Sequence, residues 1–450
     1  MLLRMNDLLD YQKKETEVAL IVDSIERSVK NGTSSQKDLM QYVRNKYILL
    51  KAFNICKQNG KAPGVDGRKF SEFKWLGNAS ESSLLYNKVL KFINEIIREL
   101  NNGTYKPMPL RRSYIRKPDG SKRALGIPTI KDRVVQQACR IVLEPIFEQS
   151  FHNCSYAYRP DRNVLKAMHQ LENIILRGKT HIFDTDIKKC FDTIPHQLIL
   201  DNLCSKVGDK KIIGLIEDWL KAPIDEDGIL TYPKCGTPQG GVISPLLANI
   251  ALHRSDDIFY LKGGLVEKYK AYEPEMIRYA DDIIVAARYI PQGLRNEISE
   301  SFENMGLQLS KEKTKIIDLQ NHEEALNFLG FQIRLTNLSP YVLWIMPRNH
   351  VIEKAYQAID AIINDNSEKE YIIQTLNAYI NFWNNYYGEV CTEIRVVRKL
   401  NNHLYEHLKK INTKRKNVCS LGEFRLQVRD ISSDKSKYTI GRKELYGFGI

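Results

Sequence analysis

A pair of adjacent carboxylates, Asp281 and Asp282, lies between two runs of apolar residues in the stretch 276–285. β-Branched and aromatic residues dominate both runs, which predicts a β-hairpin with Ala280, Asp281 and Asp282 in its tight turn. Two negative charges beside a hydrophobic sheet are costly unless a cation or hydrogen bonds compensate them. The stretch is therefore either a divalent-metal platform or an ordinary exposed turn, since turns favour Asp for local reasons.

A second short strand pattern, 181–187, carries Asp184 and Asp186. Side chains alternate between faces along a strand, so these two carboxylates share a face. Asp186 lies about 95 residues before Asp281. Hard oxygen ligands from two separate strands are what a pair of Mg²⁺ ions needs for phosphoryl transfer. The two patterns together favour a metal site over two unrelated elements.

Helical periodicity dominates both ends of the chain. The stretches with an apolar helical face are 15–28, 35–57, 82–100, 133–147, 351–363, 370–387 and 394–411. Between 111 and 123, by contrast, basic residues alternate with Tyr114 and Ile115 around a Pro-Asp-Gly turn, which predicts a hairpin. Such a hairpin suits a triphosphate, because charge-assisted bonds to phosphate are strong, although a solvated hairpin has the same pattern.

Composition adds a polyanionic partner to this picture. The net charge is +13, from 67 Lys and Arg against 54 Asp and Glu, and neutralising phosphates releases counterions. Eight cysteines without a Cys-x-x-Cys spacing argue against a zinc finger and predict free thiols in a reducing cytosol. Neither a signal-peptide core nor a run of about 18 apolar residues occurs, which predicts a cytoplasmic chain without a membrane span.

Residues 236–250 lie between the two carboxylate strands, and their first six residues hold three glycines, a proline and an amide. Glycine lets backbone approach a nucleotide closely. In this order, the three stretches resemble the palm motifs of reverse transcriptases, most closely those of the group II intron-encoded class. The resemblance covers about 61–331, with further motifs at 63–67, 115–128, 132–136, 155–160, 306–314 and 328–331.

This resemblance implies an α+β, right-hand polymerase fold, with fingers and palm built from an antiparallel sheet plus helices, and an α-helical thumb. The implied divisions are an N-terminal helical extension (1–58), fingers with part of the palm (59–180), palm (181–345), and a helical thumb or maturase-like region with a C-terminal tail (346–450). Lys409, Lys410 and 414–416 form a basic patch suited to a duplex backbone.

The resemblance also implies a role for each matching residue. The expected catalytic residues are Asp186, Asp281, Asp282 and Lys313, and the expected metal ligands are Asp186, Ile187, Asp281 and Asp282. Lys117, Arg123, Phe191 and Gln239 are expected to bind the nucleotide, and Phe328, Leu329, Gly330 and Phe331 to form the primer grip. The expected cofactor is Mg²⁺, as two ions, with Mn²⁺ as a substitute.

Several of these residues have a plainer interpretation. Lys313 is either the general acid for pyrophosphate or part of a surface charge cluster. Phe191, five residues after Asp186, is either a gate that clashes with a ribose 2′-hydroxyl or a buried core residue, and the spacing favours the gate. His196 is interpreted as structural, and Asp184 and Asp192 as second choices behind Asp186.

Tyr156, Tyr158 and Arg159 either stack on and pair with the template or pack inside the protein. Here the sequence departs from the family, which usually has Gly-Phe where this chain has Ala157-Tyr158.

The implied activity is RNA-directed DNA polymerisation, with an RNA template, a DNA product or primer and dNTPs as partners, in a bacterial cytoplasm. One role is a stand-alone enzyme that copies a cognate structured non-coding RNA in antiphage defence. The alternatives are a group II intron maturase and reverse transcriptase without an endonuclease, and an RNA-binding scaffold with an inert palm. About 100 residues follow the palm, and their spacing reveals no His/Cys cluster of an endonuclease.

Overall fold

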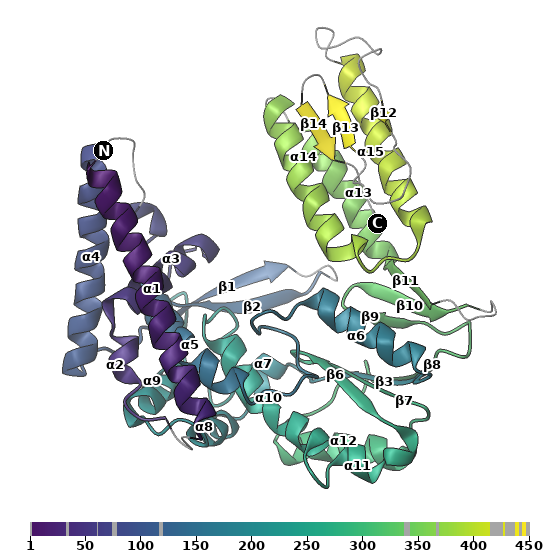
Figure 1. Cartoon of the computed structure of the whole chain (residues 1–450), viewed down its shortest axis with the longest axis horizontal. Coiled ribbons are helices and arrows are strands. Elements are labelled where there is room, and N and C mark those ends of the chain that lie inside the picture. Colours follow the sequence, from purple (N-terminus) through teal and green to yellow (C-terminus); the bar gives the residue numbers. More distant parts are fainter. Residues whose placement is uncertain are drawn as a thin grey trace.

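The computed structural model confirms the α+β class, with helical groups at two sides of the molecule and sheets between them (Figure 1). It describes residues 2–32, 36–60, 62–73, 79–116, 120–336, 343–365, 369–414, 426–427, 437–440 and 443–446. Lys117, one of the expected nucleotide-binding residues, lies outside this part of the chain, as do residues 415 and 416 of the basic patch.

The N-terminal helices form one side of the molecule (Figure 1). They are α1 (Leu2–Lys30), α2 (Met40–Val43), α3 (Lys46–Asn59), the 3₁₀ turn η1 (Phe70–Phe73) and α4 (Ala79–Asn102). The prediction of one helix over 35–57 is wrong, because the chain starts a new helix at Asn45. The Asn45 side chain accepts hydrogen bonds from the backbone N–H groups of Tyr47 and Ile48, as an N-cap does.

The basic hairpin is present and joins a small four-stranded sheet. Its strands are β1 (Leu110–Arg116) and β2 (Lys122–Ile127), and β1 also pairs with β4 (Ile224–Glu226), which pairs with β5 (Ile229–Thr231). The β1–β4 pairing is parallel, so this sheet is mixed where an antiparallel one was expected. Two helices follow the hairpin, α5 (Ile130–Glu148) and α6 (Val164–Leu176).

The central sheet has the strand order β6-β7-β3-β8 and is antiparallel throughout. Its strands are β3 (His181–Asp186), β6 (Glu275–Tyr279), β7 (Asp282–Ala287) and β8 (Lys315–Asp318). The helices between and after them are α7 (Cys190–Thr193), α8 (His196–Cys204), α9 (Lys210–Lys221), α10 (Ser244–Tyr260), α11 (Leu265–Lys268), the 3₁₀ turn η2 (Lys270–Tyr272) and α12 (Gln292–Asn304).

Both faces of the central sheet are covered, because its apolar side chains alternate between two cores. Phe183 and Val285 belong to the large core that includes α5 and α10. Ile182 and Ile284, one residue away along the same strands, belong to a second core with α6 and the sheet β9-β10-β11. This double packing holds the ends of β3 and β7 in place.

The C-terminal helices stand on the far side of the molecule from the N-terminal ones (Figure 1). The chain reaches them through β9 (Leu326–Phe328), β10 (Phe331–Leu335) and β11 (Leu343–Pro347). The bundle comprises α13 (Asn349–Ile363), α14 (Lys369–Trp383), the π-helical turn η3 (Asn384–Gly388) and α15 (Ile394–Lys414), followed by β12 (Leu426–Gln427), β13 (Lys437–Ile440) and β14 (Lys443–Tyr446). Trp383 is buried in its core.

Candidate active site

The end of β3 and the β6–β7 hairpin bring three carboxylates together. In the antiparallel pairing of β3 with β7, Asp186 lies opposite Asp282. The backbone N–H of Ile187 donates to the carbonyl of Asp281 at 3.1 Å, which ties the hairpin turn to the strand end. The two strand patterns, about 95 residues apart in the sequence, therefore meet at one point.

The hairpin turn is tighter than predicted. Only Ala280 and Asp281 form the loop, and Asp282 is the first residue of β7. Ala280 has a φ of +59°, in the left-handed region that favours glycine. A Cβ-bearing residue held there stores backbone strain, a feature that clusters at functional sites.

Burial and mutual repulsion act together on these carboxylates. Burial raises the pKa of Asp281, and the charge of Asp186 adds to the shift. Burial also raises the pKa of Asp282 to about 7, with further contributions from Asp281 and Asp186. The Asp282 residue is exposed to solvent, so a ligand can reach its carboxylate. Such a group of anions favours a cation.

Asp186 is the most buried of the three, with 7% of its surface exposed. Lys313 donates a hydrogen bond to its Oδ2 atom, and this bond raises the pKa of Lys313. The Oδ1 atom is buried and has no hydrogen-bond partner within the part of the chain that the structure describes. Buried carboxylate oxygens are normally paired, so an unpaired one pointing into this group indicates a site for a cation.

Two neighbouring residues take different positions. The Ile187 side chain has no ligand atom, so its backbone carbonyl is its possible metal ligand, and the whole residue is buried. Asp184 lies two residues before Asp186, opposite Lys315 on β8. Burial raises the pKa of Asp184 to about 6, and Lys315 opposes that shift. Because Asp184 faces a lysine on the neighbouring strand, it stays a second choice as a metal ligand.

Phe191, Tyr158 and Arg123 border the carboxylates. The Phe191 ring is half-buried and meets the Tyr158 ring edge-on, with centroids 6.3 Å apart. Burial raises the pKa of Tyr158, the charge of Asp281 raises it further, and the charge of Arg123 opposes the shift. Asp281 and Arg123 therefore both lie within electrostatic reach of the Tyr158 hydroxyl. Arg123 is exposed on β2 and also lowers the pKa of Asp281.

The structure decides between template contact and packing for Tyr156, Tyr158 and Arg159, the two interpretations that the sequence left open. Tyr156 is buried, and Arg159 is buried in an ion pair with Glu148, at 2.6 Å. Tyr158, with a φ of +60°, keeps 47% of its surface exposed beside Phe191. Packing accounts for the first two residues, and only Tyr158 is available to a ligand.

The glycine-rich loop packs directly beside Phe191. The N–H of Thr237 donates to the carbonyl of Phe191 at 2.7 Å, and a Cβ at Gly236 would meet that carbonyl oxygen at 2.7 Å. Glycine is therefore required here by close backbone approach. The Gln239 side chain donates to Asp192 at 3.1 Å. His196 contacts the carbonyl of Gly236 at 2.9 Å, which agrees with its structural interpretation.

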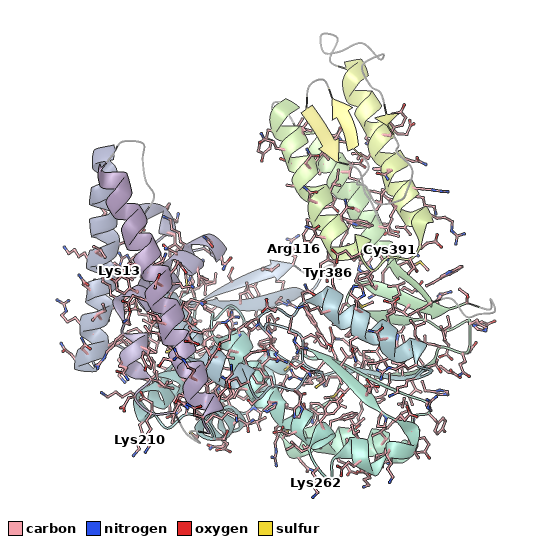
Figure 2. All side chains as sticks on the ribbon, viewed as in Figure 1. Lys13, Arg116, Lys210, Lys262, Tyr386 and Cys391 are labelled. Carbon is pink, nitrogen blue, oxygen red and sulfur yellow. The ribbon has the colours of Figure 1, made fainter. Side chains whose placement is uncertain are left out.

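The turn 328–331 joins β9 to β10, and its two phenylalanine side chains are buried. Leu329 and Gly330 form the two-residue loop, both with positive φ. The Phe331 ring stacks on Tyr386, 6.2 Å away between centroids, where the helical bundle meets this sheet (Figure 2). Residues 328–331 thus form a β-turn that also contacts the helical bundle. Their expected role as a primer grip stays a prediction.

A buried ion pair behind the carboxylates was missed by sequence reasoning. Arg278 on β6 is fully buried and donates to both oxygens of Asp256 on α10, at 2.8 and 2.5 Å. It also donates to Asn249, at 3.0 Å. The available signal was an arginine within an apolar strand, because a cation at such a position needs a buried partner. The pair fixes β6, and hence the hairpin, against α10.

No helix in the part of the chain that the structure describes has the length and apolar character needed to cross a membrane.

Comparison with known proteins gives the following relatives. A family model described as "Reverse transcriptase (RNA-dependent DNA polymerase)" matches residues 115–333. "Protein YkfC" of Escherichia coli (strain K12) is 30% identical over 310 residues, which are 62% of this chain and 77% of YkfC.

Two intron-encoded proteins are also similar. "Group II intron-encoded protein LtrA" of Lactococcus lactis subsp. cremoris is 33% identical over 279 residues, or 62% of this chain and 42% of LtrA. "Putative COX1/OXI3 intron 1 protein" of Saccharomyces cerevisiae is 26% identical over 382 residues, or 74% of this chain and 42% of that protein. The chain thus spans less than half the length of these two relatives.

Proposed function

Because the chain belongs to the reverse transcriptase family, with group II intron-encoded proteins among its relatives, we propose that it copies RNA into DNA at the group formed by Asp186, Asp281 and Asp282. The observation that carries this proposal is the pairing of Asp186 with Asp282 across β3 and β7, beside the Asp281 turn. Recognition of an RNA template, a primer and dNTPs is part of the same proposal.

These residues fit divalent cations. The donors are hard carboxylate oxygens, and burial with neighbouring negative charge raises the pKa values of Asp281 and Asp282. The buried Oδ1 of Asp186 has no hydrogen-bond partner among the residues that the structure describes. Asp186, Asp281 and Asp282 would hold Mg²⁺ or Mn²⁺, with the carbonyl of Ile187 as a further ligand. When bound there, such ions would supply stabilisation of the attacking and leaving oxygens of a phosphoryl transfer.

The surrounding side chains bind and orient the nucleotide. Arg123, exposed on the basic hairpin and electrostatically close to Asp281, binds phosphate oxygens. Phe191, held edge-on by Tyr158, excludes a ribose 2′-hydroxyl. Gln239 holds its amide beside Asp192, the residue after Phe191. Lys313 holds a proton at Nζ next to Asp186, from which it can protonate the leaving pyrophosphate.

We test the carboxylate assignment with Asp281→Ala. The variant loses extension of a primed RNA template by at least about a hundredfold, because a metal ligand is gone, while its thermal midpoint and RNA affinity stay close to those of the wild type. The matched control is Asp184→Asn, on the same face of β3, which keeps most of the activity. Unchanged extension by Asp281→Ala would refute the assignment.

The biological role has two candidates. One is a stand-alone enzyme that copies a cognate structured RNA in defence against phage. The intron-encoded relatives favour the second, an intron-encoded protein that also helps its intron RNA to splice. Sequencing the cDNA made in cells separates the two, because the template is the intron RNA itself in one case and a separate structured RNA in the other.

A further inference from the structure

Two histidines and an aspartate converge between helices α13 and α15, far from the polymerase carboxylates in the chain. The two helices lie side by side in the C-terminal bundle (Figure 1). The Nε2 atom of His403 lies 2.8 Å from Oδ1 of Asp360, and the Nδ1 atom of His407 lies 2.8 Å from the same oxygen. Sequence spacing did not reveal this group, because 43 residues separate Asp360 from His403.

The helix geometry explains the convergence. His403 and His407 are four residues apart on α15, so their imidazoles point from one face, with ring centroids 4.3 Å apart. Asp360 meets them from α13, and the ligand atoms all lie within 4.8 Å of one another. A tetrahedral ion with bonds of about 2.0–2.1 Å holds its ligands roughly 3.3 Å apart, so a small outward movement of side chains admits an ion.

We propose that Asp360, His403 and His407 form a transition-metal site of the Zn²⁺ class that links α13 to α15. Two imidazole nitrogens and one carboxylate oxygen suit Zn²⁺, Co²⁺ or Ni²⁺, whereas Mg²⁺ prefers oxygen ligands alone. Three protein ligands leave a fourth position for water. The three side chains are between 20% and 37% exposed, so an ion can reach them from solvent.

A second group of similar composition is a weaker candidate. His152, His253 and Asp257 also lie close together, with His152 Nε2 2.9 Å and His253 Nε2 3.6 Å from Asp257. The His253–Asp257 distance is longer than either His–Asp distance in the first group, and the nearby Arg278–Asp256 ion pair is neutral overall, so it adds no attraction for a cation. It therefore provides a matched control of the same chemistry.

The site would brace the helical bundle. Ala355 and Ile359 of α13 pack in one core with Leu400 and Leu404 of α15, one helical turn or so from the ligands. A metal bound to both helices in the folded state, and not in the unfolded state, stabilises the bundle by mass action. This inference is independent of the polymerase carboxylates and of the proposed function.

The test uses the full chain, stripped of metal and then held in excess Mg²⁺, with Zn²⁺ as the probe. We expect one Zn²⁺ per chain by equilibrium binding, and a rise in thermal midpoint of at least about 2 °C at saturation. Co²⁺ in place of Zn²⁺ gives the visible absorption of a tetrahedral site. His403→Ala and the more conservative His407→Gln abolish all three signals, while His253→Ala retains them.

Two results would overturn the inference. One is an unchanged midpoint and no tetrahedral Co²⁺ spectrum for the wild type. The other is loss of the signals in His253→Ala together with their retention in His407→Gln, which assigns binding to the second group. Circular dichroism of the metal-free variants tests whether each is folded. If His403→Ala is unfolded, the result for His407→Gln decides.

Discussion

Phe191 is the residue at which the choice between DNA and RNA synthesis is expected to be made. Its ring is half-buried and fixed edge-on by Tyr158, and its neighbour Asp192 holds Gln239. Contact with Tyr158 and with the core limits how far the ring can move aside for an extra hydroxyl.

We therefore expect Phe191→Ala to relax sugar selection. Removing the ring opens space for a 2′-hydroxyl. The ratio of kcat/KM for dNTP to that for rNTP therefore falls by roughly 10–100-fold, which is the size of discrimination that steric exclusion of one small group provides. Single-nucleotide extension with each substrate measures the ratio. Equal rejection of ribonucleotides by the variant and the wild type would count against the gate.

Asp282 gives the metal-free protein a pH-dependent stability. Its pKa rises from the ordinary value of 3.8 to about 7 on folding, so the folded state binds the proton more tightly than the unfolded state. The contribution of Asp282 to the free energy of unfolding is then greatest at low pH and falls as pH rises from about 4 to about 7. Under the proposed function, Mg²⁺ held by Asp282 would compensate the ionised carboxylate and oppose this loss.

The expected result is a smaller fall in thermal midpoint for Asp282→Asn than for the wild type between about pH 5 and pH 8 in EDTA. Adding Mg²⁺ at the upper pH raises the midpoint of the wild type more than that of the variant. Parallel pH profiles for the two proteins would show that Asp282 titrates near its ordinary value.

At the scale of elements, the hairpin depends on the buried pair between β6 and α10. Replacing Arg278 with Met leaves the Asp256 carboxylate buried without its partner, and breaking such a pair costs about 3–5 kcal/mol. We expect the free energy of unfolding in urea to fall by this amount. The control is Arg288→Met, which removes an exposed ion pair with Glu273 and changes stability little. Similar values for the two variants would contradict the role given to Arg278.

The whole molecule carries a net charge of +13, which predicts salt-dependent binding of RNA. If the chain neutralises about six phosphates, its RNA affinity falls by roughly a thousandfold between about 50 mM and 200 mM salt. We expect the same salt dependence for Asp281→Ala, because Asp281 is itself an anion and does not neutralise a phosphate. Fluorescence anisotropy with a labelled structured RNA measures both, and an affinity that ignores salt would argue against a backbone-dominated interface.

Local periodicity was enough to predict the two carboxylate strands and most helices, and the family resemblance implied the α+β class. Alternation with period two along 181–187 and 276–285 is a property of neighbouring residues, as is the apolar face of 82–100, so the sequence alone contains it. The order of the motifs added the family, and the comparisons confirmed it.

Only the tertiary structure decided the features that depend on residues far apart in the chain. Tyr156 and Arg159 are buried, whereas Tyr158 is exposed beside Phe191, although all three lie in the same short motif at 155–160. Sequence spacing likewise did not predict that Arg278 pairs with Asp256. Nor did it predict that His403 and His407 converge on a residue of another helix. Propensity and periodicity describe a segment and its own faces, whereas burial and ligand geometry are set by which other segment lies against it.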